Sequence, residues 1–435
     1  MNTRNNILLY LFLALPALLM QSCLKDDHEV FDENSSARMQ EAMTLAHLAL
    51  VSSENGWIMD YYPDRNLSYG GYAYTVKFDD EKAEVRYEGD TDQVVTSYYK
   101  ITNDNGPVLS FDTYNELLHF YATPSSSEYE GKDGDFEFVI DEVDTDIIKL
   151  HGKRNQNLVV LRKLEEPAET AIKKVAKLSN GAFLKGYTGT EFSGDFDLNA
   201  RSMSFTNADG TQLADKSPFI FTEDGIRLYK PVTVGGKTMQ NFKYDEASQK
   251  LTCTDEGATD IVLNGIPHDD TYQLFDNFAG DYYFVDYFVT MGGNPIAVTL
   301  EPDKMHRIYR MKGVNADYEL RMRYDKNLGT LTLYPQGLGY DETLDIGVYL
   351  LGLYGDNFYI SLEGGMRLLW NGDNVNPVYQ WIDNGDVEGE EIHSFTVMGL
   401  DLESGRVEQE LDAKWNFGDA THGTFVPYLD RLIKR

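Results

Sequence analysis

The spacing of apolar residues predicts two helices in this chain. Between residues 39 and 50 apolar side chains recur at helical spacing, and Gly56 supplies a C-terminal stop. A second apolar face runs from residue 172 to 178 after Pro167, whose fixed φ suits the first turn of a helix. We therefore expect one helix to open the folded part of the chain and another to follow residue 165.

Elsewhere the pattern changes to short alternating runs rich in Tyr, Val, Phe and Thr, separated by turn residues. The runs lie at residues 72–78, 83–87, 97–102, 108–111, 117–121, 136–140, 147–151 and 158–161, between 182 and 263, and between 282 and 400. The pattern predicts a mainly β (α+β) fold of repeated antiparallel β-meander modules, the first two each preceded by a helix. A sandwich and a barrel give the same alternation, so both remain open.

The start of the chain predicts a lipoprotein signal. Arg4 precedes an apolar stretch from Ile7 to Met20, which is shorter than the ~20 residues that a membrane-spanning helix needs. Ser22 is a small residue directly before Cys23, so we expect cleavage there and lipidation of Cys23. The alternative is a secreted protein whose signal peptide happens to end near a cysteine.

These features divide the chain into five segments. We expect a signal peptide at 1–22, a lipidated tether at 23–35, a helix plus antiparallel β module at 36–165, a second helix plus β module at 166–268, and a third β-rich module at 269–435. The tether begins with Leu24-Lys25-Asp26-Asp27, which resembles an export signal to the outside of the outer membrane. We therefore expect a lipid anchor in the outer membrane and exposure at the cell surface.

The charge balance limits the partners. Asp and Glu number 71 against 38 Lys and Arg, which gives a net charge of −33. Nucleic acid needs a basic surface, so we expect no nucleic acid partner. Cys253 is the one cysteine besides Cys23, and its place in an alternating run predicts a buried thiol.

The sequence contains none of the common catalytic motifs. It has no His-Glu-x-x-His helix, no Gly-x-Ser-x-Gly elbow, no phosphate-binding loop and no dinucleotide fingerprint. We expect no cofactor and no enzyme activity, although a hydrolase with paired carboxylates has no sequence signature. Asp383, Asp386 and Glu388 offer a candidate calcium site, with a solvated acidic loop as the alternative.

An aromatic pair marks one candidate ligand site. Trp370 and Trp381 flank a polar loop that contains Asp373 and Asn374. Sugars bind with their apolar C–H face against an aromatic ring, while Asn and Asp side chains bond the hydroxyl groups. We expect these four residues to contact a glycan or a peptide, and burial of both indoles in a β core is the alternative.

A second aromatic cluster follows the first predicted helix and consists of Trp57, Tyr61 and Tyr62. It is a candidate ligand site for the same reason. Its alternative is packing against the end of that helix.

A recurring aspartate marks four predicted hairpins. Asp79, Asp141, Asp245 and Asp325 each follow an apolar residue and precede a polar turn and an alternating strand. An Asp carboxylate accepts hydrogen bonds from the amides of such a turn, so we interpret the repeat as structural. It indicates duplicated β-meanders and not one large enzyme fold.

An ordered series of motifs resembles one lipoprotein family. The series is Cys23-x-Lys25-Asp26, Val30-Phe31-Asp32, Arg38-Met39, Asn55-Gly56-Trp57, Tyr61-Tyr62-Pro63, Gly70-Gly71-Tyr72, Gly106-Pro107-Val108-Leu109-Ser110-Phe111-Asp112 and Tyr114-Asn115. It is similar to the Bacteroidota lipoproteins grouped as domain of unknown function DUF4302. The resemblance implies an accessory of a SusC/SusD-like nutrient uptake system, with a TonB-dependent transporter and a SusD-like lipoprotein as partners.

These observations predict a non-catalytic surface lipoprotein that binds a glycan or a peptide for uptake. Two alternatives remain. One is a hydrolase whose paired carboxylates are far apart in the sequence, and the other is a structural or assembly lipoprotein without a small ligand.

Overall fold

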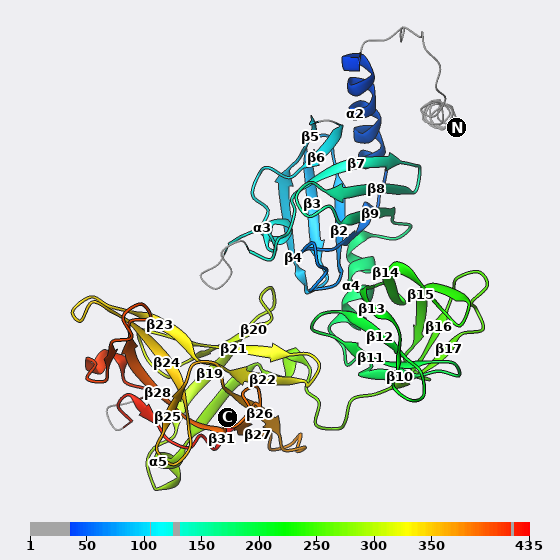
Figure 1. Ribbon diagram of the computed structural model, residues 1–435. Helices are drawn as coiled ribbons and strands as arrows, with labels where there is room; N and C mark the ends of the chain where they lie inside the picture. The colour runs from blue at the N-terminus through cyan, green and yellow to red at the C-terminus, as the bar shows by residue number, and fades with distance from the viewer. Residues whose placement is uncertain (1–34, 105, 125–130, 419–421) are drawn as a thin grey trace. The chain divides into compact units, whose positions relative to one another are not determined.

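The computed structural model describes residues 35–104, 106–124, 131–418 and 422–435 (Figure 1). The predicted signal peptide, Cys23 and the predicted tether up to residue 34 lie outside these residues. Contacts divide the chain into two compact units, Met1–Ser179 with Gly186–Gly265 and Asn180–Lys185 with Ile266–Arg435, where the sequence analysis expects three modules. No helix in the described residues is long and apolar enough to cross a membrane.

The first unit begins with a helix and an open antiparallel sheet. Helix α2 (Ser35–Val51) packs on β2 and on β5 to β7. The nine-stranded sheet has the order β4-β3-β2-β1-β9-β8-β7-β6-β5. Its strands are β1 (Trp57–Tyr61), β2 (Tyr72–Phe78), β3 (Lys82–Tyr87), β4 (Asp90–Tyr98), β5 (Lys100–Asn103), β6 (Pro107–Ser110), β7 (Glu137–Val143), β8 (Ile147–Gly152) and β9 (Leu158–Lys163).

A second helix and a closed barrel complete the first unit. Helix α4 (Ala168–Ser179) buries its apolar face, including Ile172 and Val175, against β1 to β4 and β13. The barrel runs in chain order from β10 to β17. Its strands are β10 (Gly186–Thr188), β11 (Ser193–Asp197), β12 (Ser202–Thr206), β13 (Gln212–Phe221), β14 (Gly225–Val234), β15 (Lys237–Asp245), β16 (Lys250–Cys253) and β17 (Val262–Ile266).

The second unit contains another closed barrel, which ends where β31 pairs with β18. The barrel strands are β18 (Gly280–Val285), β19 (Ile296–Asp303), β20 (Ile308–Lys312), β21 (Leu320–Asp325), β22 (Thr330–Leu333), β26 (Met366–Trp370), β27 (Val378–Asp383) and β31 (Arg431–Lys434). Alternating burial along β21 places Leu320, Met322 and Tyr324 in the core.

A six-stranded sheet packs beside this barrel and shares its hydrophobic core through residues such as Val348, Phe395 and Val397. The order is β23-β24-β28-β29, with β25 added to β24 and β30 added to β28. Its strands are β23 (Gln336–Asp341), β24 (Ile346–Tyr354), β25 (Tyr359–Ser361), β28 (Ile392–Leu400), β29 (Val407–Glu408) and β30 (Phe425–Val426). Short helices lie at η1 (Phe275–Phe278), α5 (Tyr287–Thr290) and η2 (Ala413–Trp415).

The predicted fold class is confirmed, because the described chain is mainly antiparallel β with a helix before the first strands. The choice between sandwich and barrel is resolved as two closed barrels and two further sheets that do not close. The strand predicted at 117–121 is wrong. Helix α3 (Glu116–His119) lies there, since the Asn115 side chain accepts hydrogen bonds from the amides of Leu117 (3.1 Å) and Leu118 (3.3 Å). Likewise, Asp286 caps α5 and ends the strand predicted at 282–290.

The turn role of the repeated aspartate is confirmed at three of its four positions. Asp79, Asp245 and Asp325 each accept a hydrogen bond from the amide two residues ahead, at 2.8, 3.0 and 2.8 Å. Asp141 is the exception. It lies at a register shift between β7 and β8, and both of its carboxylate oxygens are 2.8 Å from Nδ1 of His151.

Candidate functional site

The predicted tryptophan pair does not form an exposed aromatic wall. Trp370 and Trp381 lie on the paired strands β26 and β27, and Trp381 is opposite Leu368. The Trp381 side chain is only 5% exposed and lies 6.1 Å from the ring of Phe284 in the barrel core. Trp370 is half-buried at the margin of the same core. A ligand therefore cannot stack on Trp381 from solvent.

The loop between these strands is a self-contained turn. Asp373 accepts hydrogen bonds from the amides of Val375 (2.8 Å) and Asn376 (3.1 Å), and these bonds lower the pKa of its carboxyl. Asn374 is exposed at the tip. The structure thus places Asp373 and Asn374 in one loop, but it does not combine them with two accessible indoles.

The cluster after the first helix is a packing site. Trp57 is fully buried, and its Nε1 donates a hydrogen bond to the carbonyl of Leu50 (2.8 Å) in the last turn of α2. Tyr61 and Tyr62 are also buried, and Tyr62 stands edge-on to Tyr229 at 4.6 Å. All three residues are therefore core residues. This is the alternative that the sequence analysis gave to a ligand site.

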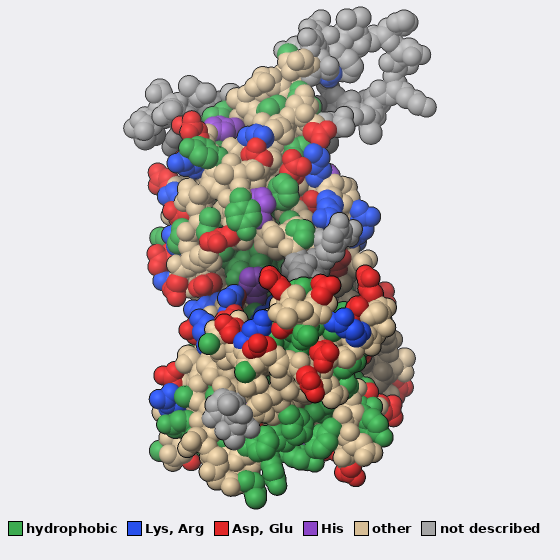
Figure 2. All heavy atoms as spheres, turned by 90° about the vertical axis from the view of Figure 1, so that its left-hand side faces the viewer, with side chains coloured by type: hydrophobic (Ala, Val, Ile, Leu, Met, Phe, Trp, Pro, Cys, Tyr) green, Lys and Arg blue, Asp and Glu red, His purple; other side chains and the backbone are tan. Residues whose placement is uncertain are grey.

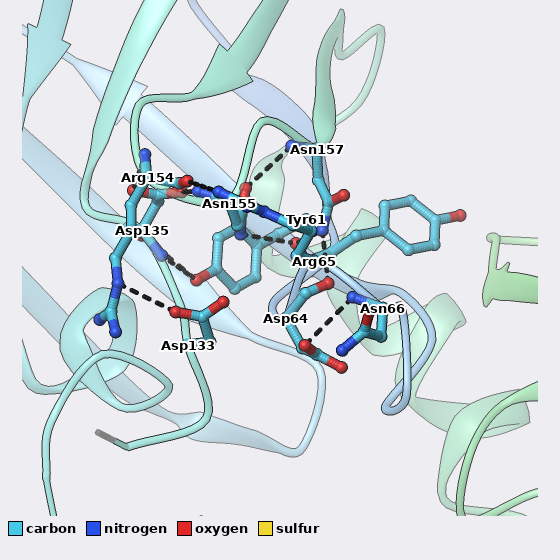
Figure 3. A network of polar contacts seen from close by, with 10 residues as sticks. Tyr61, Asp64, Arg65, Asn66, Asp133, Asp135, Arg154, Asn155 and Asn157 are labelled. Atoms are coloured by element: carbon cyan, nitrogen blue, oxygen red, sulfur yellow. Dashed lines mark hydrogen bonds and ion pairs between the residues drawn. The ribbon is translucent and has the colours of Figure 1, made fainter. Parts of the chain in front are cut away.

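Tyr61 belongs to a polar network that joins three segments of the first unit (Figure 3). Its hydroxyl accepts a hydrogen bond from the Asp135 amide (2.9 Å) and donates one to the Asp135 carbonyl (3.2 Å). The Asp135 carboxylate accepts from the amides of Arg154 (2.9 Å) and Asn155 (2.8 Å). Burial raises the pKa of Asp135.

The same network fixes the loop after β1. Asn157 donates through Nδ2 to the carbonyls of Tyr62 (3.0 Å) and Asp64 (2.7 Å), and Arg65 donates to the carbonyl of Arg154 (2.9 Å). These groups are satisfied by one another, so we interpret the network in Figure 3 as a structural junction.

The predicted calcium ligands are engaged within their own loop. Asp383 accepts from the amides of Gly385 and Ile392, both at 2.9 Å. Asp386 accepts from the Tyr334 hydroxyl at 2.8 Å, and Glu388 is exposed. Among the described residues, no group of three or more His, Cys, Asp or Glu side chains has metal-binding geometry.

A groove of about 570 Å³ lies beside α2, between that helix and the ends of β4 and β5. Its polar side chains are used internally. Lys100 pairs with Asp112, the Tyr99 hydroxyl donates to the Asp79 carbonyl (2.7 Å), and His47 Nε2 is 3.2 Å from the Asp80 carbonyl. These contacts favour a structural role for this groove.

The second unit carries an exposed row of aromatic rings that we call the aromatic surface. Figure 2 shows hydrophobic side chains gathered at the lower end of its view, the end at which Figure 1 draws α5. Tyr287 and Tyr428 are each 46% exposed, and Tyr359 is 56% exposed. The surface consists of Tyr287 at the start of α5, Phe358 and Tyr359 at β25, His393 in β28 and Tyr428 after β30.

Four of these rings are in direct contact with one another, while the ring of Tyr359 contacts Tyr354 (5.8 Å). The ring of Tyr428 lies 6.1 Å from Tyr287, 5.8 Å from Phe358 and 4.7 Å from His393, on which it stacks. Asn357 donates a hydrogen bond to the Tyr359 hydroxyl (3.2 Å) at the edge of the row. The surface therefore joins flat apolar faces to a small number of polar groups, as ligand sites do.

Backbone strain coincides with this surface. Among the described non-glycine residues with a left-handed backbone, only Phe358 (φ 53°) and Tyr428 (φ 40°) are aromatic. That conformation is rare for bulky residues and costs about 1–3 kcal/mol at each position. Two residues with this backbone conformation therefore touch each other on the exposed surface.

A groove of about 350 Å³ continues from the aromatic surface onto the outer face of the six-stranded sheet. Phe358 belongs to both, and it lies 5.2 Å from Phe425 on the far wall. The strand register places Leu353, Ile360, Thr396 and Phe425 on this one face. The opposite face, which includes Phe395 and Val397, packs on the barrel core.

Sequence reasoning missed the aromatic surface because its residues come from four separate segments. Tyr287 and Tyr428 are far apart in the chain and meet only because β31 closes the barrel on β18. Ordinary tyrosines carry no local motif. The only available signal was the abundance of Tyr and Phe, at 29 and 22 residues.

The fold and this surface define a mainly β, barrel-containing protein with an exposed aromatic surface. The chain belongs to the family described as Domain of unknown function (DUF4302), whose model matches residues 27–246. A second model, DUF4987, also described as a domain of unknown function, matches residues 254–398. No curated protein matches the chain. The family resemblance seen in the motifs is thereby confirmed.

Proposed function

We propose that this protein is a non-catalytic lipoprotein of the outer cell surface that binds a glycan for nutrient uptake. The observation that carries the binding role is the aromatic surface, with Tyr287, Phe358 and Tyr428 in ring contact. The predicted lipid at Cys23 supports the location. The family resemblance supports an uptake system in which a TonB-dependent transporter and a SusD-like lipoprotein are the partners.

Glycans suit this surface for a physical reason. The C–H faces of a pyranose lie flat on aromatic rings, so each ring covers apolar surface of the sugar. Tyrosine hydroxyls and the Asn357 amide can bond sugar hydroxyls at the edge of the row. A peptide ligand would gain less from these rings, because its backbone presents no flat C–H face comparable to that of a pyranose.

The direct test is a glycan array and a peptide array on the soluble chain that begins at Leu24. Tyr287→Ala and Tyr428→Ala should each weaken binding of the bound glycan about 10-fold, which corresponds to about 1.4 kcal/mol. Tyr340→Ala is the matched control, because Tyr340 is 55% exposed in the same unit but lies outside the aromatic surface. Unchanged affinity in both surface variants, or binding of peptides alone, would contradict the proposal.

The location is tested separately. Cys23→Ala should abolish labelling with a radioactive fatty acid and release the protein from the membrane fraction, because a lipid chain supplies the anchor. Surface protease accessibility of the unmodified protein in whole cells then reports the leaflet. Retention of the Cys23→Ala variant in the membrane would contradict the lipid anchor and leave the glycan test unaffected.

A further inference from the structure

We propose that the 350 Å³ groove is a second subsite of the same ligand and selects an uncharged acyl substituent on the glycan. This inference rests on the proposed glycan-binding function. The aromatic surface alone indicates a glycan. The groove narrows the ligand class to neutral glycans that carry an acyl group.

The first argument is charge. Every residue that lines the groove is uncharged, in a protein whose net charge is −33. Apolar side chains of the outer face line the groove, namely Leu353, Phe358, Ile360, Met398 and Phe425. With no Lys or Arg to pair with phosphate, sulfate or uronate, and no Asp or Glu to pair with an amine, the groove suits a neutral group.

The second argument is the apolar outer face of the sheet. An antiparallel sheet that packs one face on a core usually presents polar residues on the other face. Here the outer face carries Leu353 and Met398, which are only 3% and 5% exposed, and Ile360, which is 41% exposed. The groove therefore has an apolar lining where the outer face of such a sheet is usually polar, and this lining suits an apolar group.

The third argument is continuity. Phe358 forms part of the aromatic surface and also lines the groove. A sugar ring that stacks on Phe358 and Tyr428 therefore carries its substituents toward the groove. An occupant must combine a sugar with a neutral apolar branch, and an acyl group has this chemistry.

Polar groups at the groove fit the carbonyl of an acyl group. Gln409 is exposed at the rim and offers an amide donor. The Thr396 hydroxyl donates to the Thr424 carbonyl (3.2 Å), so it is already satisfied within the protein. At about 350 Å³ the groove lies at the small end of ligand pockets, which span about 300–1,000 Å³.

The experiment compares neutral polysaccharides with and without acetyl groups. Glucomannan and xylan, each in its O-acetylated form and after alkaline deacetylation, are titrated calorimetrically into the soluble chain that begins at Leu24. Acetylated polymer should bind about 10-fold more tightly, the usual gain from filling an apolar subsite with one small group. Polygalacturonate, a polyanion, should not bind.

Variants separate the groove from the aromatic surface. Ile360→Asp should reduce the preference for acetylated polymer to about 1-fold while binding of the deacetylated polymer persists. Val407→Asp is the control, because Val407 is exposed in β29 of the same sheet but does not line the groove. A preference unchanged in Ile360→Asp would overturn the inference.

Other outcomes distinguish this inference from the proposed function. Equal binding of both forms, with loss of both in Tyr428→Ala, would overturn the acyl subsite and leave glycan binding in place. Tighter binding of polygalacturonate would also overturn the neutral ligand class. Binding of no polysaccharide at all would overturn both proposals.

Discussion

At the scale of single residues, the aromatic surface contains two residues with a left-handed backbone conformation, which is unfavourable for residues with a side chain. Tyr428 adopts φ 40° and Phe358 φ 53°, where the Cβ atom approaches the following carbonyl oxygen. Their rings nevertheless contact each other at 5.8 Å. Tyr428 is 46% exposed, so burial of its ring does not account for the strained backbone.

Replacing Tyr428 by glycine or by alanine should separate strain from packing. Both variants lose the ring, but only glycine adopts φ 40° freely. We expect Tyr428→Gly to be about 1 kcal/mol more stable than Tyr428→Ala in urea unfolding, while neither binds the glycan ligand normally. Equal stability of the two variants would show that the backbone is unstrained.

A half-buried histidine gives stability a pH dependence. Burial, together with nearby Lys185, lowers the pKa of His268 from 6.5 to about 4. The unfolded chain therefore binds a proton at higher pH than the folded chain does, so stability is lost as the pH falls from about 6.5 to about 4. We expect His268→Gln to remove about 1 kcal/mol of this loss, a value reduced for partial exposure. Urea midpoints at pH 7 and pH 4.5 measure it, and an identical decrease in both proteins would exclude His268.

At the scale of elements, a buried ion pair joins the sheet and the barrel of the first unit. Glu88 lies between β3 and β4, and Arg201 lies between β11 and β12. Arg201 pairs with Glu88, donates to the Gly71 carbonyl (2.6 Å), and covers the ring of Tyr72 at 4.0 Å. The sequence does not predict this ion pair, because 113 positions separate the two residues.

Removing one partner should cost more than removing both. Arg201→Met leaves the Glu88 carboxylate buried without its cation, and we expect a loss of about 3–5 kcal/mol in the free energy of unfolding. Arg201→Met combined with Glu88→Gln should lose clearly less. Lys173→Met is a control, because its pair with Glu169 is exposed on α4 and should contribute about 0.3–0.5 kcal/mol. A double variant as unstable as Arg201→Met alone would contradict this account.

At the scale of the whole molecule, the DUF4302 match and the fold end at different places. The match ends at residue 246, just after β15, but the first barrel closes only through β16 and β17. A barrel that lacks these two strands leaves the backbone groups of β15 that pair with β16 unpaired, and it uncovers core residues of the remaining strands such as Tyr187 and Phe242. The structural unit therefore extends past the matched residues.

Two truncated chains test this boundary. A chain of residues 36–267 should be monomeric and unfold in one cooperative transition, because it keeps all eight barrel strands. A chain of residues 36–246 should aggregate or remain partly unfolded. Size-exclusion chromatography and circular dichroism compare the two, and a cooperative 36–246 chain would show that β16 and β17 are dispensable.

The sequence by itself determined the class of fold, both helices, most hairpin turns and the family. Those features depend on local patterns, since helical spacing, strand alternation and a turn aspartate act over a few residues. It also predicts the lipid at Cys23, which awaits its own test.

Only the tertiary structure decided how the strands close and which aromatic residues are accessible. Trp381 and Tyr428 look equally suited to ligands in the sequence, yet one lies in the barrel core and the other on its surface. The reason is that barrel closure joins β18 to β31 across most of the second unit, and this long-range pairing sets which face of each strand is buried.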